Sequence, residues 1–502
     1  MNAKVINELI DLPNKLRGTY YWGGVTILSI LVLAGIGAWV FQLIYGLSIT
    51  GLNEPIFWGI YIINFVFFIG ISHAGTLISA ILRLSRAEWR RPVTRMAEAI
   101  TVFALFIGAS MIIVDMGRPD RLLNVFSYGR IQSPLMWDLL SVTAYLFASI
   151  VYLYIPLIPD LAYMRDRVQN RGVLYRFYNN LALNWQGTEL QKKRLDKAVK
   201  VSAIMIIPLA ISVHTVVSYV FAVTVQPMWH STIFGPYFVI GAIFSGIAVL
   251  LIVMVIVRKA LQLEKILKEI HFKYLSYLLL LMFGLWFYGT LGEHVITGYG
   301  NKPDEMKVVI SKIFGEHSWA FTGMFATMFL AFFIMTPGDS FMRAFRLPTM
   351  EIHPSVAFFL ALFGWGGWFA VIQMNGLTSI VSILTGVIYF FVVFLVIVPT
   401  LRKDWFRVAL YSGIFVTIGM WLERFTIVLP TLSRPRIEAL GWGFYTPTFV
   451  EIVITVAGFS ALALFFMIFA KLFPLVSAWE VEEGAEAVEQ VKQNVREYLP
   501  EE

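Results

Sequence analysis

Residues 114–140, VDMGRPDRLLNVFSYGRIQSPLMWDLL, place six charged side chains between two apolar runs, residues 93–115 and residues 134–157. A helix that crosses about 30 Å of hydrocarbon needs roughly 20 apolar residues, and both runs are long enough. Helices joined by so short a connection are expected to be antiparallel neighbours. The charged residues at this end of the pair are Asp115, Arg118, Asp120, Arg121, Arg130 and Asp138. The stretch therefore predicts a membrane-crossing helical pair whose tip holds ionisable groups.

The whole chain has the composition of a polytopic transmembrane protein. Hydrophobic residues make up 58% of it, charged residues only 14%, and the mean hydropathy is +0.73, which is more apolar than a soluble domain. We therefore expect an all-α, helical fold with about 10 to 12 membrane spans. The apolar runs lie near residues 22–48, 55–82, 93–115, 134–157, 199–225, 235–258, 273–296, 317–337, 355–373, 378–400, 407–429 and 448–473.

The positions of Lys and Arg predict the orientation, because cytoplasmic connections are enriched in them. The connections after spans two, four and six are basic, whereas those after spans one and five have neither residue. We expect both termini in the cytoplasm: an N-terminal segment, residues 1–21, that is not cleaved, and an acidic tail, residues 474–502, that is either a solvated helix or partly disordered. Between them lies the transmembrane domain, residues 22–473, with a long cytoplasmic loop, residues 158–198. Residues 114–140 then lie at the outer face, and the net charge of +7 reports topology and contact with lipid rather than nucleic acid.

Cysteine is absent from the sequence. Disulfides, thiolate metal sites, iron–sulfur clusters and covalently attached c-type haem are therefore excluded within this chain. The sequence also has no Gly-rich phosphate loop, no Ser/His/Asp arrangement and no zinc-spaced histidines. We predict no metal site, and any chemistry must lie between the helices.

Ionisable residues within spans are costly to bury and are functional candidates by default. The candidates are His73, Glu98, Asp115, Asp138, His214, Glu293, His294, Glu423, Arg424 and Glu451.

Asp115 and Asp138 stand at the facing ends of neighbouring spans, so both carboxylates are expected to face one cavity. Arg118 could neutralise either of them, and Tyr128 and Trp137 supply flat apolar surface. The alternative is a helix-end network in which Asp138 stabilises a helix N-terminus.

Two histidines, His73 and His214, lie inside spans two and five. Facing imidazoles could ligate a b-type haem, serve as packing residues, or relay protons. Counting residues to the span ends places His73 nearer the cytoplasm than His214. The adjacent pairs Glu293/His294 and Glu423/Arg424 point about 100° apart on a helix, so each residue is expected to face a different neighbour rather than its own partner. We predict that His73, Glu98, His214, Glu293 and Glu423 form partial proton paths toward the cytoplasm, with polar packing as the alternative for each residue.

Several segments resemble the NrfD/PsrC family of quinone-interacting membrane subunits. They are ISHAGTLISAILRL, DMGRPDR, SPLMWDLLSVTAYL, LIPDLAYMRDR, SVHTVVSYVFAVTVQPMWHSTIFGPYFVIGAIFSG and GMWLERFTIVLPTL, and they span residues 70–450 in order. Within this family they are most similar to the ActC subunit of bacterial alternative complex III. The resemblance implies two four-helix bundles with flanking helices, in a bacterial inner-membrane protein without a haem or cluster of its own. It makes spans 317–337 and 355–373 additional to the family's helices.

The resemblance also implies the function and the partners. The chain would oxidise menaquinol near the periplasmic face and pass electrons to an iron–sulfur subunit, within a complex that includes a multihaem cytochrome c subunit and a second NrfD-like membrane subunit. Carried over residue by residue, the catalytic positions are Asp115 and Asp138. Candidate quinol-binding residues are Arg118, Tyr128, Trp137, His214 and His230. An acidic position of some relatives corresponds to Val220, so one carboxylate is missing here.

Two rival functions stay open. A secondary transporter often has twelve spans with a basic loop after the sixth, although the halves of this chain show no similarity. A structural anchor for redox subunits would need no carboxylates at the outer interface. The weakly charged outer connections, residues 225–235 and 431–447, contain Trp229, His230 and Trp442, and we expect the iron–sulfur subunit to cover them.

Overall fold

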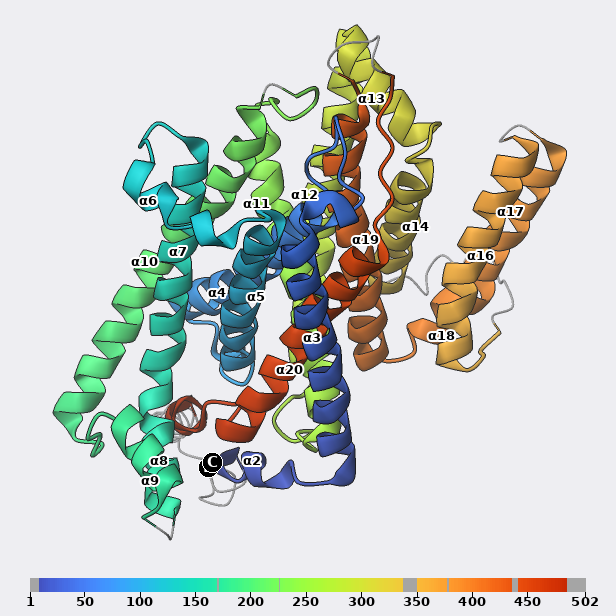
Figure 1. Ribbon diagram of the computed structural model, residues 1–502. Helices are drawn as coiled ribbons and strands as arrows, with labels where there is room; N and C mark the ends of the chain where they lie inside the picture. Colours follow the sequence, from blue (N-terminus) through green and yellow to red (C-terminus); the bar gives the residue numbers. More distant parts are fainter. Residues whose placement is uncertain are drawn as a thin grey trace.

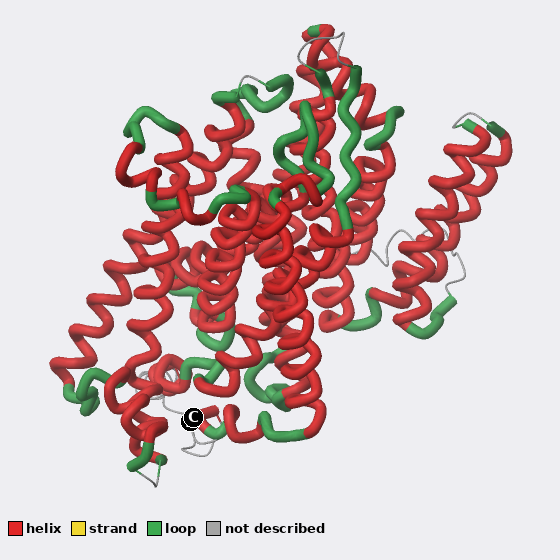
Figure 2. Tube along the Cα trace, viewed as in Figure 1, coloured by secondary structure: helices red, strands yellow, loops and turns green. Residues whose placement is uncertain are grey.

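The computed structural model describes residues 9–168, 171–224, 226–336, 350–376, 379–435 and 441–484. Within these residues the secondary structure is helical, apart from one isolated bridge between Asn53 and Ile56 (Figures 1 and 2). Twelve of the described helices are long and apolar enough to cross a membrane, in agreement with the predicted class. They are α3 (Thr19–Tyr45), α4 (Ile60–Leu84), α5 (Thr94–Asp115), α7 and α8 (Pro134–Arg167), α10 (Glu189–Ala222), α11 (Phe234–Ala260), α12 (Glu269–Gly300), α14 (Ser318–Met335), α16 (Pro354–Asn375), α17 to α18 (Ile380–Leu401), α19 (Trp405–Ser433) and α20 (Phe449–Leu472).

Shorter helices connect these spans. They are α2 (Leu12–Lys15), η1 (Leu47–Ile49), η2 (Glu88–Arg90), η3 (Pro119–Arg121), α6 (Asn124–Tyr128), η4 (Ile155–Leu157), α9 (Val173–Leu181), α13 (Pro303–Ile313) and the π-helical turn η5 (Val393–Ile397). Within the long segments, α7 is Pro134–Tyr154, α8 is Ile158–Arg167, α17 is Ile380–Val392 and α18 is Val398–Leu401. The end of the molecule with α2, α8 and α9 is named the inner end, and the end with α6 and α13 the outer end (Figure 1).

The first four-helix bundle consists of α4, α5, α7 and α10, which pack on one another. Helix α4 is buried along most of its length. It approaches α5 closely at Gly75, where a Cβ atom would lie 1.9 Å from the carbonyl oxygen of Ala97. Only a glycine permits this approach, so the two backbones are in direct contact.

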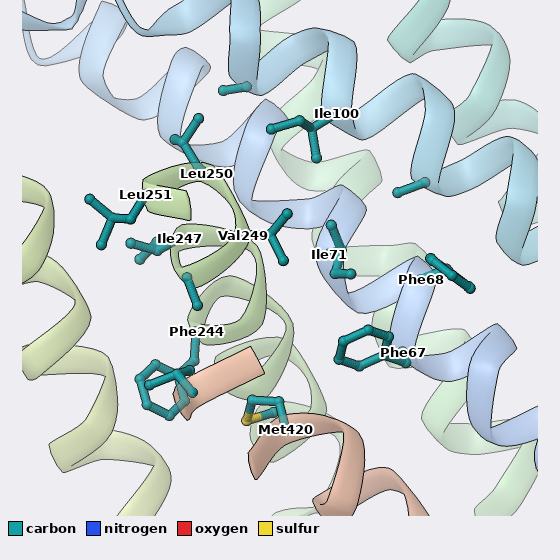
Figure 3. Close-up of a cluster of buried hydrophobic side chains, with 14 of the residues drawn as sticks. Phe67, Phe68, Ile71, Ile100, Phe244, Ile247, Val249, Leu250, Leu251 and Met420 are labelled. Carbon is teal, nitrogen blue, oxygen red and sulfur yellow. The ribbon is translucent and has the colours of Figure 1, made fainter. Parts of the chain in front are cut away.

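The second bundle consists of α11, α12, α14 and α19, and it packs on α4 through α11 and α19. Large apolar side chains fill the space between the bundles, and Figure 3 shows Phe67, Phe68, Phe244, Leu250 and Met420 among them. The prediction of two four-helix bundles is confirmed. One detail is wrong: residues 317–337 were expected to be additional, but α14 is a full member of the second bundle, because packing partners cannot be read from an apolar run.

Two pairs of helices flank the bundles. Helices α3 and α20 pack on each other, and a Cβ atom at Gly35 would lie 2.1 Å from the Cβ of Ala457. The other pair, α16 with α17, stands at the side of the second bundle (Figure 1) and is mostly exposed. Despite Gly364, Gly366 and Gly367, α16 is one continuous helix. The pair of α16 and α17 is therefore additional to the two four-helix bundles.

The first part of the predicted acidic tail is buried at the inner end, not solvated. Glu480 is 1% exposed and pairs with Arg83 at 2.6 Å and with Arg90 at 2.8 Å. Burial alone raises the pKa of Glu480, but the two guanidinium groups outweigh it and hold the pKa below the usual value. The basic connection between α4 and α5 therefore binds this segment, which explains the correction. Residues 485–502 of the tail lie outside the described residues.

Both ends of the described chain lie at the inner end of the molecule. The ammonium group of Lys471 donates hydrogen bonds to the carbonyl oxygens of Pro13 at 3.0 Å and Leu16 at 2.9 Å. The first and the last described segments therefore share one side of the helices. That this side is cytoplasmic stays a prediction from the charge distribution.

Candidate functional site

Asp115 and Asp138 lie at the outer end of the first bundle, on two helices that pack on each other. Asp115 is the last residue of α5, and Asp138 lies in the second turn of α7. Asp138 is 7% exposed. In both carboxyl groups the Oδ1 atom is buried without a hydrogen-bond partner among the described residues. Buried polar atoms are normally satisfied, so each unsatisfied carboxyl oxygen marks a place where a ligand or water belongs. That the two carboxyl groups face one cavity stays a prediction.

Helix capping does not account for Asp138. The N-cap residue of α7 is Ser133, five positions earlier, and it makes no side-chain capping bond. The Asp138 carboxylate accepts no hydrogen bond at Oδ1 from the first turn. The side chain is therefore not the N-cap of α7. The alternative in which its charge stabilises the helix N-terminus stays open.

The other residues predicted for this site are not gathered around the carboxyl groups. Arg118 is exposed and pairs with Asp120, through bonds of 3.0 and 2.9 Å. Tyr128 is 82% exposed on α6, and the indole N–H of Trp137 donates to the carbonyl oxygen of Ile131. The two carboxyl groups are thus left without the expected arginine.

Asp115 has polar neighbours that the sequence did not single out. Gln42 of α3 donates to the carbonyl oxygen of Val114 at 3.0 Å and accepts from the hydroxyl of Tyr61 at 2.6 Å. Both side chains are buried. The only signal in the sequence is a glutamine within an apolar run.

Glu451, at the start of α20, is the charged neighbour of Asp115. It is fully buried, and its carboxylate accepts hydrogen bonds from the backbone of Gly51 at 2.7 Å, the hydroxyl of Tyr445 at 2.7 Å and the backbone of Thr448 at 2.8 Å. These donors hold Glu451 in place as part of a capping box.

An apolar groove of about 360 Å³ runs between the same helices, α5, α7 and α20, toward the inner end. It is lined by Val102, Phe103, Phe106, Leu146, Ile150, Phe465, Ile468, Phe469, Leu472 and Phe473. Such a surface suits a hydrocarbon chain.

His73 and His214 meet at the centre of the molecule, although counting from the span ends placed them at different depths. Their ring centroids are 4.1 Å apart, and neither side chain is exposed. The prediction of depth failed because α10 begins ten residues before the apolar run at 199. The ring nitrogens of His73 lie 3.0 Å from the carbonyl oxygen of Ile69 and 2.5 Å from that of Ala210, whereas both nitrogens of His214 are without a partner in the described part of the chain.

Glu423 and Arg424 pair with each other, which corrects the expectation that adjacent residues face different neighbours. Their side chains approach to 2.6 Å, and both are buried. Arg424 lies against α11, where a Cβ atom at Gly241 would come within 2.8 Å of its Nη2 atom. It is also a charged neighbour of His214. The long side chains bridge the angle between the positions, and Arg424 links the second bundle to the histidine pair.

The residues predicted for a proton path lie at three levels. Glu98 is near the inner end, where the Ser79 hydroxyl donates to it at 2.5 Å and Arg83 and Glu480 are its charged neighbours. His73 is at the centre. Glu293 lies toward the outer end of α12, with Lys312 and Glu423 as charged neighbours. His294 instead bonds to the carbonyl oxygen of Thr290 at 2.8 Å, so these two adjacent residues do face different neighbours.

The predicted partner surface at the outer end needs one correction. Trp229 is 1% exposed: its indole donates to the carbonyl oxygen of Ile427 at 2.9 Å and its ring stacks on Trp58. It is therefore a packing residue. His230 is exposed and lies 3.4 Å from Glu305 of α13, and Trp442 is also exposed. Val225 and residues 436–440 lie outside the described residues.

Two cavities open at this end. One of about 410 Å³ is lined by Glu54, Pro55, Phe57, Trp58, Thr224, Gln226, Trp229, Leu432, Arg434 and Pro435. The other, of about 780 Å³, is lined by Thr224, Gln226, Pro227, His230, Lys302, Pro303, Asp304, Glu305 and Arg434. Among the residues the structure describes, no cluster of three or more His, Asp or Glu side chains could hold a metal ion.

The fold and the buried polar groups define a polytopic helical membrane protein with two bundles and carboxyl groups between its helices. The family model "Polysulphide reductase, NrfD" matches residues 48–340, which is more than half of the chain and includes α14. The chain belongs to the NrfD family. Helices α16 to α20 lie outside the matched region. The similarity to the ActC subunit stays a prediction.

Three curated relatives are similar to about half of the chain. A putative membrane subunit of a dimethyl sulfoxide reductase from Halobacterium salinarum is 28% identical over 241 residues, 48% of this chain and 52% of the relative. A selenate reductase subunit from Mesobacillus selenatarsenatis is 24% identical over 45% of this chain and 54% of the relative. An Hdr-like menaquinol oxidoreductase integral membrane subunit from Archaeoglobus fulgidus is 21% identical over 46% and 49%. The chain spans about half the length of the curated relatives it matches.

Proposed function

We propose that this chain is the quinol-binding membrane subunit of a multi-subunit oxidoreductase and that it oxidises menaquinol near the periplasmic face. The observation that carries the proposal is the pair of buried carboxyl groups, Asp115 and Asp138, with unsatisfied oxygens at one end of the first bundle. The relatives support it, because their names describe subunits of two reductases and of a menaquinol oxidoreductase.

The reaction needs proton acceptors at the quinol hydroxyls and an electron acceptor nearby. Oxidation of the quinol breaks two O–H bonds and releases two protons and two electrons. Asp138 accepts one proton as general base and Asp115 the other, while the electrons pass to an iron–sulfur subunit. The apolar groove between α5, α7 and α20 takes the isoprenoid chain, which makes a membrane quinol a better substrate than a soluble hydroquinone.

The assembly and location follow from this reaction. The iron–sulfur subunit lies over the outer connections, where the electrons leave. The complex also includes a multihaem cytochrome c and a second NrfD-like protein, and it resides in a bacterial inner membrane with both termini of this chain in the cytoplasm. Lipid surrounds α16 and α17. A secondary transporter is the weaker alternative, since the relatives' names describe redox complexes.

The complex also translocates protons through buried groups that follow one another between the two ends. Glu98 is next to the inner end, His73 and His214 are in contact at the centre, and Glu423 pairs with Arg424 at the boundary of the second bundle. Glu293 stands beyond them toward the outer end. The path thus has an inner and an outer part, rather than leading only to the cytoplasm.

The test is Asp138→Asn in the assembled complex, with Asp120→Asn as the matched control. Asparagine keeps the size of the side chain but removes the base, so we expect quinol oxidation to fall by roughly 10² or more. Asp120 is exposed and paired with Arg118, so its variant should keep wild-type turnover. An assembled Asp138→Asn complex that oxidises quinol at the wild-type rate would remove Asp138 from the mechanism.

A further inference from the structure

Helix α9 (Val173–Leu181) lies at the inner end of the molecule, in the connection between α8 and α10 (Figure 1). Two hydrogen bonds fix its depth. The hydroxyl of Tyr178 donates to the carbonyl oxygen of Leu472 at 2.9 Å, and the hydroxyl of Tyr154 donates to the carbonyl oxygen of Leu181 at 2.6 Å. Tyr154 is the last residue of α7, and Leu472 is the last residue of α20. Because apolar spans end near the membrane surface, these bonds place α9 at the level of that surface.

Helix α9 exposes apolar side chains on one side. Val173 is 86% exposed, Leu174 is 48% exposed and Phe177 is 38% exposed. In a helix of 3.6 residues per turn these three positions fall within one stripe about 100° wide, whereas Arg176 and Asn179 lie outside it on the polar side. A short helix with this division, next to the ends of apolar spans, has the pattern of a helix that lies flat in the membrane interface.

The apolar stripe of α9 is continuous with an apolar surface of the spans. The ring centroid of Phe177 lies 6.1 Å from that of Phe473. Phe473 in turn lines the inner part of the apolar groove between α5, α7 and α20. The stripe therefore adjoins a surface that faces hydrocarbon, which favours lipid over a water-soluble protein as its occupant.

Positive charges border the stripe. Arg176 follows Val173 by three positions and stands beside it on the helix, and the guanidinium of Arg171 lies over the ring of Tyr175, 5.9 Å from its centroid. Neither arginine pairs with a carboxylate in the part of the chain that the structure describes. Residues 171–200 contain seven Lys or Arg residues and only two acidic residues. An apolar stripe bordered by unpaired arginines complements an anionic phospholipid, which offers acyl chains beside a phosphate group.

We propose that α9 is an interfacial helix that binds anionic phospholipid at the inner end of the molecule. Val173, Leu174 and Phe177 insert among the acyl chains, and Arg171 and Arg176 hold the phosphate groups, because a guanidinium matches phosphate oxygens with two parallel hydrogen bonds. This inference does not depend on quinol oxidation, since α9 lies at the opposite end of the molecule from the two carboxyl groups of the candidate site.

Photo-crosslinking from lipid tests the proposal. The assembled complex is placed in nanodiscs of neutral phospholipid that contain a small fraction of phosphatidylglycerol with a photoreactive group in its acyl chain, and the labelled residues are mapped by mass spectrometry. We expect labels within α9, and roughly tenfold fewer with a phosphatidylcholine that carries the same acyl chain. No label on α9 with either lipid, as when a protein subunit covers the stripe, would overturn the proposal. Equal labelling by the two lipids would overturn the assignment of the arginines to the phosphate.

Arg171→Gln and Arg176→Gln separate the contribution of charge from that of the apolar stripe. Both side chains are exposed, so assembly should be retained. Labelling of α9 by phosphatidylglycerol should fall about fivefold for each arginine removed, with labelling by phosphatidylcholine unchanged. The matched control is Lys192→Gln, whose ammonium group is exposed and already pairs with Glu189 at 3.3 Å, and it should keep the wild-type labelling. Wild-type labelling by phosphatidylglycerol in the double arginine variant would show that the arginines do not bind the lipid.

Discussion

Glu480→Gln tests the docking of the C-terminal segment, residues 474–484, at the inner end of the first bundle. The glutamine keeps the shape of the side chain but removes the charge that Arg83 and Arg90 share. Both guanidinium groups are largely buried there, and removal of one member of a buried ion pair costs about 3 to 5 kcal/mol because the other charge is left uncompensated. Other contacts of the segment remain: the backbone N–H groups of Ala478 and Trp479 donate to the Asp160 carboxylate at 3.2 Å each, and the Trp479 indole donates to the carbonyl oxygen of Pro156 at 2.7 Å.

Hydrogen exchange of residues 474–484 in the purified complex, followed by mass spectrometry, measures the opening of this segment. The expected loss of stabilising free energy corresponds to exchange in this segment that is roughly 10² to 10⁴ times faster. Exchange in α4 and α11 should be unchanged. The matched control is Glu483→Gln. Its carboxylate pairs with Arg91 at 2.9 Å but is 52% exposed, so its loss should cost about 0 to 1 kcal/mol. Equal exchange in the two variants would refute the reasoning from burial.

The same ion pairs give a pH dependence. The pKa of Glu480 is lowered in the folded protein, so the stabilisation is present above the unfolded value of about 4.3 and is lost as the pH falls through the lower folded value. Exchange in residues 474–484 should therefore accelerate in acid beyond the intrinsic effect of pH. This acceleration should be absent in Glu480→Gln, and its persistence there would assign it to another group.

Two further predictions concern packing and the proton path. Gly75→Ala places a Cβ atom 1.9 Å from the carbonyl oxygen of Ala97, and because the backbone must move, we expect the free energy of unfolding to fall by about 1 to 3 kcal/mol. Gly284→Ala, with open space around it, is the control and should leave the stability unchanged. Equal melting temperatures of the two variants would contradict the close packing of α4 on α5. Glu98→Gln keeps a partner for the Ser79 hydroxyl but cannot carry a proton, so protons released per electron should fall while assembly is retained; an unchanged ratio would exclude Glu98 from the path.

The sequence by itself determined the class of the protein, because the number and length of apolar runs depend only on composition along the chain. All twelve predicted spans correspond to helices of the structure. The positions of the ionisable residues within those spans were also fixed by the sequence, and Asp115 and Asp138 were found in this way. The sequence failed where the number of residues to the end of an apolar run was used to infer the depth of a side chain in the membrane. Helix α10 extends well beyond its apolar run, and His73 and His214 are therefore in contact rather than at different depths.

Only the tertiary structure decided which polar groups face one another. An apolar run does not encode its packing partners, so the sequence could not assign α14 to the second bundle. It also could not predict the ion pair of Glu423 with Arg424. Glu480 lies in a polar segment that the sequence alone marks as solvent-exposed, yet it is buried because Arg83 and Arg90 supply counter-charges. Burial of a charge is a property of what surrounds it, and those surroundings come from helices that are distant in the sequence.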